Sequence, residues 1–281
     1  MSDGAPSASQ ARIRVGVSGW TYPRWRGDFY PKGLAHRLEL AYVAARMSSV
    51  EVNGSFYSLQ RPSSYTTWAE QTPDTFEIAV KGSRYITHMK QLRDIDVALA
   101  NFFASGVLAL GPKLGPVLWQ LPPRMSFDAQ RMADFFDRLP RTTGEAAGLA
   151  RSHDDKVKEG RSLVDAVDER PIRHVLEPRH VSFEADEATK LLRRNDIGTV
   201  WADAAGKFPV FDADTSGLRY VRLHGHTELY ASNYDDEQLN EWAARCRGWR
   251  DLGRDVYVFF DNDARGYAPW NAVGLEERVR R

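Results

Sequence analysis

Short apolar runs with high β propensity alternate with amphipathic helical patterns along the whole chain. Eight such runs are rich in Val, Leu, Phe, Tyr and Trp, and polar or turn-forming residues bound each of them. They cover residues 13–18, 49–57, 76–82, 116–121, 173–179, 198–203, 219–225 and 256–263. The pattern predicts eight strands with helices between them.

The segments between the runs carry apolar residues at helical spacing. Met132, Phe135 and Leu139 share one helix face, as the 3.6-residue period requires. Asp235 followed by Gln238 resembles a capping box and predicts the start of a further helix.

Eight strands that alternate with helices are typical of a (β/α)8 TIM-type barrel, an α/β fold of about 250 residues. A doubly wound sheet is the alternative, but "GVSGW" after the first strand lacks the G-x-G-x-x-G spacing of a dinucleotide site. We expect a disordered N-terminal tail over residues 1–11 and a single domain over residues 12–281. Residues 142–171 are polar and long for a connection, so we predict a surface excursion with one or two short helices.

Composition narrows the class of protein. The 38 basic and 38 acidic residues give no net charge, which argues against non-specific attraction to nucleic acid or to anionic membranes. The single cysteine, Cys246, excludes an intrachain disulfide and a multi-cysteine metal site. The sequence shows neither a secretory signal nor an apolar run of ~20 residues, so we expect a cytoplasmic protein without a membrane partner.

Polar or ionisable residues stand at the ends of seven predicted strands. Loops at these ends build the active sites of TIM barrels, and strand residues i and i+2 share a face. The residues are Glu51, Asn53, Lys81, Gln120, Glu177, Arg179, Asp203, Arg222, His224, Asp261, Asn262 and Asp263. Because an unpaired buried charge costs several kcal/mol, we expect them to pair with each other or to bind a ligand.

The residue types suggest an anionic ligand. Lys81, Arg179 and Arg222 are candidates to hold it, since arginine binds phosphate or carboxylate in a bidentate manner. The candidate acids and bases are Glu51, Glu177, His180 and His224.

The same groups have two other interpretations. One is a structural network of the pairs Glu177–Arg179, Glu51–Lys81 and Asp203–Arg222. The other is a zinc or manganese site, for which the right ligand types are present in Glu177, His180, Asp203, His224, His226 and Asp261. No tight metal motif occurs, so a divalent metal is not favoured, and the sequence identifies no cofactor.

An aromatic and basic stretch follows the first predicted strand, "GWTYPRWRGDFYPK" at residues 19–32. With Trp20 in this stretch, and with Tyr57 and Tyr230, it would form a rim that stacks on a base or sugar while cations meet phosphates. The alternative, which we favour, is a loop whose aromatic side chains form a small satellite core.

Several longer motifs lie in order between Ile13 and Ala272. They include "GVSGWTYPRWRGDFYP", "GPVLWQLPP", "RHVLEPRHVSF", "YVRLHGH" and "VYVFFDNDARGYAPWNA". Through them the chain resembles the YecE-like family, also called domain of unknown function 72. The resemblance implies a TIM-type barrel and a bacterial cytoplasmic protein, with no established activity.

The family's shared polar positions carry over to this sequence. They are Glu51, Asn53, Tyr57, Lys81, His88, Gln120, Glu177, Arg179, His180, Arg222, His224, Asn262 and Asp263. The chain departs from the family pattern at Pro178, which puts the alignment of Glu177 with Arg179 in doubt. It also departs at Asp261, which adds a carboxylate.

We therefore expect an enzyme that binds an anionic, phosphate-bearing small molecule or nucleotide at the carboxyl end of the barrel. Hydrolysis, phosphoryl transfer and phosphodiester chemistry are the reaction classes that suit such a site. A protein that binds or processes nucleic acid is one alternative, and a non-catalytic scaffold with a structural charge network is another. The sequence does not specify the oligomeric state.

Overall fold

The strands form a closed parallel barrel in which each strand pairs with its neighbours in sequence and the last pairs with the first. The structure is a computed structural model, and it describes residues 11–280. The strands are β1 (Ile13–Ser18), β2 (Ser49–Val52), β3 (Glu77–Lys81), β4 (Leu114–Gln120), β5 (His174–Glu177), β6 (Ile197–Asp203), β7 (Leu218–Leu223) and β8 (Asp255–Phe260). The predicted (β/α)8 fold is confirmed, whereas the predicted tail lies outside the described residues except for Ala11.

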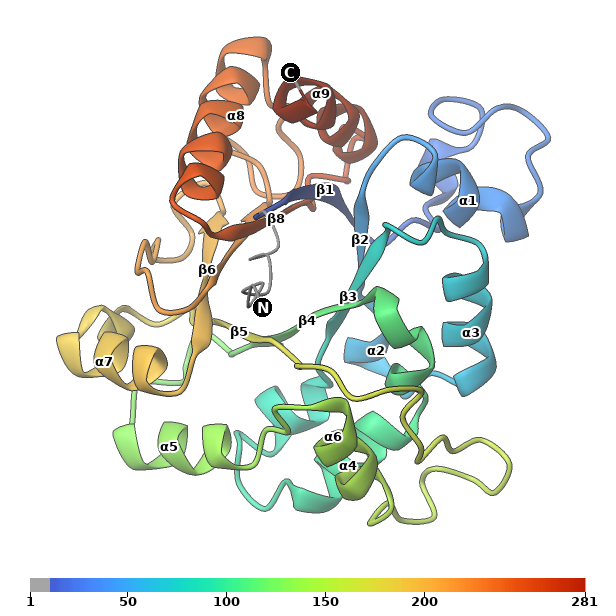
Figure 1. Cartoon of the computed structure of the whole chain (residues 1–281). Helices are drawn as coiled ribbons and strands as arrows, with labels where there is room; N and C mark the ends of the chain where they lie inside the picture. The colour runs from blue at the N-terminus through green and yellow to red at the C-terminus, as the bar shows by residue number, and fades with distance from the viewer. Residues whose placement is uncertain (1–10, 281) are drawn as a thin grey trace, which may run out of the picture.

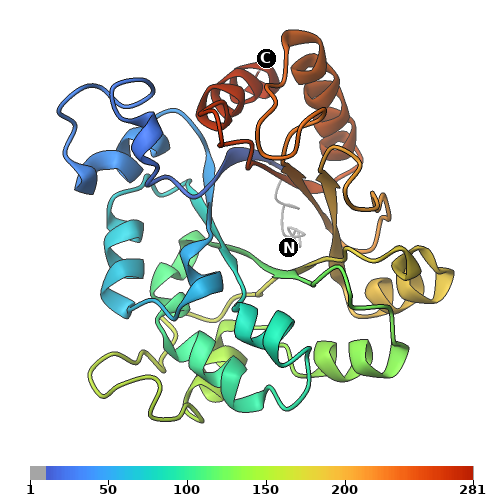
Figure 2. The same cartoon turned by 180° about the vertical axis from the view of Figure 1, so that it is seen from behind.

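Helices surround the barrel when it is viewed from either side (Figures 1 and 2). They are α1 (Glu39–Ala44), α2 (Gly54–Tyr57), α3 (Pro62–Glu70), α4 (Asp96–Ala104), α5 (Ala129–Asp137), α6 (Thr143–Ala150), α7 (Asp186–Arg194), α8 (Asp236–Asp251) and α9 (Ala268–Arg280). The predicted capping box starts α8, because Asp235 and Gln238 cap each other's backbone. Met132 and Phe135 lie buried on α5, as their spacing predicts.

Two segments differ from the predicted pattern, and the surface excursion agrees with it. The strand predicted over residues 49–57 ends at Val52, because residues 54–57 form α2. The connection from β6 to β7, residues 204–217, contains no helix. The surface excursion contains one helix, α6, followed by a loop that returns to Thr143 through a hydrogen bond from the Thr143 amide to the Arg170 carbonyl (2.9 Å).

The barrel interior has three layers along its axis. At the amino ends of the strands, Arg14, Glu77, Arg173 and Asp255 form a group of ion pairs that we call the floor cluster. Apolar and aromatic side chains fill the middle layer: Ala79, Leu118, Val175, Val200, Leu218, Tyr220, Tyr257 and Phe259. Charged side chains return at the carboxyl ends, which form the barrel mouth. The apolar layer therefore separates two charged ends.

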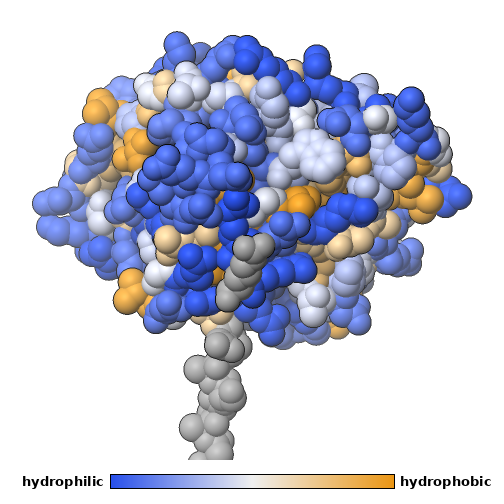
Figure 3. All heavy atoms as spheres, turned by 90° about the horizontal axis from the view of Figure 1, so that it is seen from above, coloured by the Kyte–Doolittle hydropathy of each residue, from blue (hydrophilic) through white to orange (hydrophobic). Residues whose placement is uncertain are grey.

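In the view of Figure 3, hydrophilic residues dominate and hydrophobic ones are scattered. Over residues 11–280, we find no helix with the length and apolar character required to cross a membrane.

Candidate functional site

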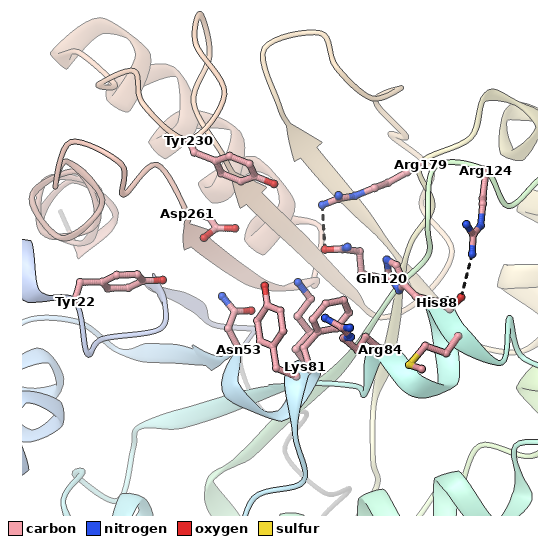
Figure 4. A pocket seen from close by; sticks show the side chains of 13 residues that line it. Tyr22, Asn53, Lys81, Arg84, His88, Gln120, Arg124, Arg179, Tyr230 and Asp261 are labelled. Carbon is pink, nitrogen blue, oxygen red and sulfur yellow. Dashed lines mark hydrogen bonds between the residues drawn. The ribbon is translucent and has the colours of Figure 1, made fainter.

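A pocket of about 1030 Å³ lies at the barrel mouth (Figure 4). Its lining residues follow every strand except β6, which fits the usual position of active sites in TIM barrels. They are Tyr22, Asn53, Phe56, Tyr57, Lys81, Arg84, His88, Met89, Gln120, Arg124, Arg179, Tyr230 and Asp261.

Arg222 is the centre of a buried charge cluster below this pocket. Its guanidinium donates to both oxygens of Glu51 (2.8 and 3.1 Å) and to Oε2 of Glu177 (2.9 Å). It also lies 3.1 Å from Oδ2 of Asp261. Together with Arg179 and His224, these residues form what we call the mouth cluster. Since Arg222 is fully buried and surrounded by carboxylates, its charge is not available to a ligand in the pocket.

Glu51 accepts hydrogen bonds from three different side chains. Ser18 donates to Oε1 (2.8 Å) and Tyr220 donates to Oε2 (2.6 Å), in addition to the bidentate contact with Arg222. Burial raises the pKa of Tyr220 well above its ordinary value, and the adjacent carboxylate of Glu51 raises it further, so the phenol remains a donor. Glu51 therefore holds Arg222 in place rather than facing the pocket.

Glu177 connects two arginines, and its arrangement answers the question raised by Pro178. Arg179 Nε donates to Glu177 Oε1 (2.8 Å), while Arg222 donates to Oε2 (2.9 Å). Strand β5 ends at Glu177, so Pro178 lies beyond the ladder and the i and i+2 side chains still meet. Burial alone would raise the pKa of Glu177, but the two guanidiniums outweigh it and hold the pKa well below the usual range. At neutral pH Glu177 is thus a carboxylate and a weak base.

His224 is also buried beneath the pocket. Its Nε2 lies 3.3 Å from Nη1 of Arg222, and because arginine can only donate, Nε2 accepts and the proton resides on Nδ1. Nδ1 lies 3.0 Å from Asp261 Oδ2, but the angle between the two groups does not suit a hydrogen bond. The Tyr230 ring, which lines the pocket, packs edge-on against the imidazole, at 5.4 Å between ring centres.

Lys81 differs from the charged groups around it. Its ammonium lies 4.4 Å from the centre of the Phe56 ring, and it has no ion pair or hydrogen bond to any of residues 11–280. Burial lowers the pKa of Lys81 to about 8. The charge of Arg222 also lowers it, whereas the nearby carboxylates oppose this shift. Gly82 follows directly, and a Cβ there would lie 2.3 Å from the Trp119 ring, so the chain needs glycine to leave β3 at this point.

Positive charge dominates the upper part of the pocket. Arg84 and Arg124 lie at the rim, with Arg179 and Lys81 deeper. Arg179 Nη2 donates to Gln120 Oε1 (3.0 Å), which fixes the guanidinium over the pocket. Burial lowers the pKa of His88 to about 4, and all four cations lower it further. His88 is thus neutral at pH 7, as expected in a positive potential.

The structure divides the site residues predicted from sequence into three groups. Those that line the pocket are Asn53, Tyr57, Lys81, His88, Gln120, Arg179 and Tyr230. Those buried below it are Glu51, Glu177, Arg222 and His224. Those elsewhere are Trp20, His180, Asp203, Asn262 and Asp263. None of the four predicted acids and bases lines the pocket.

The prediction that Asp203 and Asn262 face the mouth is wrong. Asp203 shares a strand face with Trp201, which packs against the helix residue Trp242 outside the barrel, and it accepts a hydrogen bond from Tyr234 (2.9 Å). Asn262 donates to Asn271 on α9 (2.8 Å). Both side chains point from the barrel toward the helices.

The remaining predicted residues also have local partners. His180 caps a short helical turn, η5 (Val181–Glu184), through a hydrogen bond from the Ser182 amide to Nδ1 (3.2 Å). Asp263 accepts a hydrogen bond from the Trp25 indole. Trp20 packs edge-on against Trp68, at 5.3 Å between ring centres.

The aromatic stretch after β1 is packed inside the protein, as we favoured, but its rings belong to the main hydrophobic core and not to a separate satellite core. Trp25, Phe29 and Tyr30 are at most 2% exposed and pack against each other. They therefore cannot stack on a ligand in this conformation.

Of the three structural pairs predicted, only Glu177–Arg179 is confirmed, with 2.7 Å between the nearest charged atoms. The pair Asp203–Arg222 is wrong because Asp203 lies outside the barrel. The pair Glu51–Lys81 is wrong because Arg222 occupies both oxygens of Glu51.

Sequence reasoning missed three lining residues of chemical interest, Phe56, Arg84 and Arg124, and it named Asp261 as a strand-end residue without including it in the anion site. Asp261 carried a signal, since it has the strand parity of the inward-facing Tyr257 and Phe259. Arg84 and Arg124 lie in the segments after β3 and β4, where strand parity gives no information.

Side chains that suit a divalent metal are present but separate. In the described part of the chain, no three His, Cys, Asp or Glu side chains come together as a metal site requires. His226 contacts Asp203 on the outer side of the barrel, and His180 binds Ser182.

Comparison with known proteins gives a consistent family. The family model described as "Protein of unknown function DUF72" matches residues 14–281. UPF0759 protein YecE of Escherichia coli (strain K12) is 28% identical over 280 residues, which cover 96% of this chain and 93% of YecE. UPF0759 protein YunF of Bacillus subtilis (strain 168) is 30% identical over 302 residues, which cover 94% of this chain and 94% of YunF.

Solved structures share the fold. A DUF72 family protein from Thermotoga maritima MSB8 aligns with a TM-score of 0.74 at 23% identity, over 96% of this chain and 99% of that one. A DUF72 family protein from Enterococcus faecalis V583 aligns with a TM-score of 0.71 at 14% identity, over 96% of both chains. The resemblance found in the sequence motifs is thereby confirmed, and the chain belongs to the DUF72 family.

Proposed function

We propose that the protein is an enzyme that binds a small anionic, phosphate-bearing compound in the mouth pocket, with a nucleotide as the preferred class. The observation that carries this proposal is the imbalance of charge. The pocket and the mouth cluster contain five cations, Lys81, Arg84, Arg124, Arg179 and Arg222, against three carboxylates, Glu51, Glu177 and Asp261. The excess of two positive charges lies on the pocket side, because the carboxylates already contact Arg222.

The shape and lining of the pocket support a ligand of nucleotide size. Its volume is at the upper end of the ~300–1,000 Å³ typical of small-molecule sites. Tyr57 is 69% exposed and Tyr230 is 38% exposed at its edge, so both offer ring faces to a base or sugar. Guanidiniums suit the phosphate through paired N–H donors.

The alternative of nucleic-acid binding has less support than the sequence suggested. It relied on the aromatic stretch after β1 as a stacking rim, and those rings are buried. Two results together would favour it: the protein binds single-stranded nucleic acid with an affinity that falls as salt rises, and Tyr57→Ala lowers that affinity.

Thermal unfolding with inorganic phosphate, pyrophosphate and nucleoside phosphates tests the proposal. We expect a concentration-dependent rise in Tm, and we expect Arg124→Ala and Arg84→Ala each to weaken the response about tenfold, or ~1.4 kcal/mol. These two arginines are preferable to Arg179 and Arg222, whose loss would leave buried carboxylates unpaired.

The matched control is Arg151→Ala. Arg151 directly follows α6 and does not line the pocket; its guanidinium is 61% exposed and pairs with Asp165. This variant should respond like the unmodified protein. An equal loss in all three variants would mean that phosphate acts through general surface charge, and the proposal would fail.

A further inference from the structure

We propose that Lys81 is a catalytic residue that forms an imine with the carbonyl group of an anionic aldehyde or ketone bound in the mouth pocket. This inference rests on the proposed function, because the pocket arginines would hold the phosphate or carboxylate of the same substrate. It adds a reacting group and a class of substrate to that site.

The first support is the contrast between two buried lysines. Lys113 is 9% exposed, and its ammonium donates to the carbonyl oxygens of Ala69 and Thr72 at 2.6 Å each. Lys81 is 8% exposed, yet its ammonium has no such acceptor among residues 11–280. The Lys81 ammonium instead lines the mouth pocket, where a bound molecule can reach it, whereas the Lys113 ammonium is occupied by backbone carbonyls.

The second support is the direction in which Lys81 points. Lys81 is the last residue of β3, and its side chain extends into the pocket beside Asn53 and Gln120 (Figure 4). Asn53 Oδ1 is itself buried without a hydrogen-bond partner in the described part of the chain. Because that oxygen is buried, it is the lysine amine that a molecule in the pocket can reach.

The third support is chemical. An amine reacts with a carbonyl only in its neutral form, and a lysine gains this form near neutral pH when it is desolvated or lies near another cation. Lys81 has both features, since it is buried and Arg222 lies nearby; its pKa is lowered to about 8. Roughly a tenth of the molecules then carry the neutral amine at pH 7.

The step balances without an additional reagent. The nitrogen lone pair attacks the carbonyl carbon, and the C=O π electrons move to oxygen, which takes up a proton as nitrogen loses one. The carbinolamine then loses its hydroxyl group and a proton from nitrogen as water while the C=N bond forms. The net change is amine plus carbonyl compound to imine plus water.

The test uses the full-length protein with glyceraldehyde 3-phosphate and with its uncharged analogue glyceraldehyde. Borohydride reduces any imine to a stable amine, which peptide mass spectrometry assigns to a particular lysine. We expect Lys81 to be labelled at least tenfold faster by the phosphorylated aldehyde than by glyceraldehyde, and inorganic phosphate should compete. Labelling should reach half of its maximal rate near pH 8, whereas ordinary exposed lysines continue to rise toward pH 10.

Two internal controls and one variant make the result decisive. Lys113 should stay unlabelled because its ammonium is bonded, and the exposed Lys190 should react equally with both aldehydes. Lys81→Arg keeps a cation in the pocket but cannot form an imine, so it should lose the label while Lys190 in the same sample is still labelled.

The possible failures are distinguishable. If phosphate raises Tm but Lys81 is labelled no faster than Lys190, the imine inference is wrong and the proposed function stands. If Lys81 is labelled rapidly but equally by both aldehydes, and phosphate has no effect on Tm, the lysine is reactive and the proposed anion site is wrong.

Discussion

The two ends of the barrel both carry arginine–carboxylate clusters, but they balance charge differently. In the floor cluster two arginines, Arg14 and Arg173, face two carboxylates, Glu77 and Asp255, and each arginine contacts both carboxylates. In the mouth cluster Arg222 and Arg179 face three carboxylates, and Lys81 next to them contacts none of the three within ion-pair distance. The floor cluster is complete by itself, whereas the mouth contains a cation that has no partner in the protein.

The clusters also differ in their contact with solvent. Arg173 and Asp255 are 33% and 28% exposed, while Arg222 and Glu51 are at most 1% exposed. Water can therefore replace a lost partner at the floor but not around Arg222. In TIM barrels the amino-terminal end serves stability and the carboxyl-terminal end serves function. The proposed function requires the mouth cluster to do both, since its buried part supports the lining of the pocket.

Arg222→Met should give the largest effect, because it leaves Glu51, Glu177 and Asp261 without their shared cation. Loss of one partner from a buried ion pair costs ~3–5 kcal/mol. We expect the free energy of unfolding in urea to fall by this amount at pH 7.

Arg173→Met is the matched variant at the floor. Its carboxylate partners keep Arg14 and contact with solvent, so we expect a loss of only ~1 kcal/mol. Equal losses in the two variants would show that burial does not distinguish the clusters.

Lys81→Met and Lys113→Met should change stability in opposite directions. The folded pKa of Lys81, about 8, lies below that of an unfolded lysine, about 10.5. Between these values the unfolded state binds more protons, so stability rises with pH there, and below pH 8 Lys81 costs a constant amount of stability. We expect Lys81→Met to stabilise the protein at pH 7 by ~1–3 kcal/mol and to abolish the rise between pH 8 and 10.5.

Lys113→Met should instead destabilise the protein by ~1–3 kcal/mol, because two buried carbonyl groups lose their donor. Urea unfolding from pH 7 to 10.5 measures both variants. If Lys81→Met proved as destabilising as Lys113→Met, Lys81 would be a structural residue, and the contrast between the two ends would lose its basis.

The barrel and much of its mouth follow from local patterns in the sequence. Strand parity alone aligns Glu51, Glu177 and Arg222 with the interior, because each lies two residues from an inward-facing position or from another mouth residue. The same rule applied strictly would have excluded Asp203, which has the parity of the outward-facing Trp201. It would also have chosen Asp261 over Asn262, since Tyr257 and Phe259 face inward.

Other features depend on distances that the sequence does not contain. Arg222 on β7 contacts Glu51 on β2 and Glu177 on β5. These contacts depend on how strands that are distant in sequence meet around the barrel axis. Arg84 and Arg124 reach the pocket from loops, whose backbone follows no fixed period. Whether Lys81 has a partner depends on side chains from several strands, so no short stretch of the sequence indicates it.

The smallest predicted effect compares two half-buried carboxylates at opposite ends of the barrel. At the mouth, burial raises the pKa of Asp263 to about 6 against the hydrogen bond from Trp25, and the charge of Asp261 raises it further. At the floor, burial acts on Asp255 in the same direction, but the Arg12 backbone N–H and the guanidiniums of Arg173 and Arg14 outweigh it and lower the pKa.

The two groups should therefore give stability profiles of opposite sign. The folded state holds the Asp263 proton more tightly than the unfolded state, so its contribution falls as pH rises from about 4 to about 6. Asp255 contributes stability above its unfolded pKa and loses it as pH falls. Asp263→Asn should thus stabilise the protein above pH 6 by less than ~1 kcal/mol after solvent screening, and Asp255→Asn should destabilise it there. Urea unfolding at pH 4.5 and pH 7 measures the sign of each effect. The same sign for both carboxylates would contradict the view that nearby guanidiniums match the charge of Asp255 and not that of Asp263.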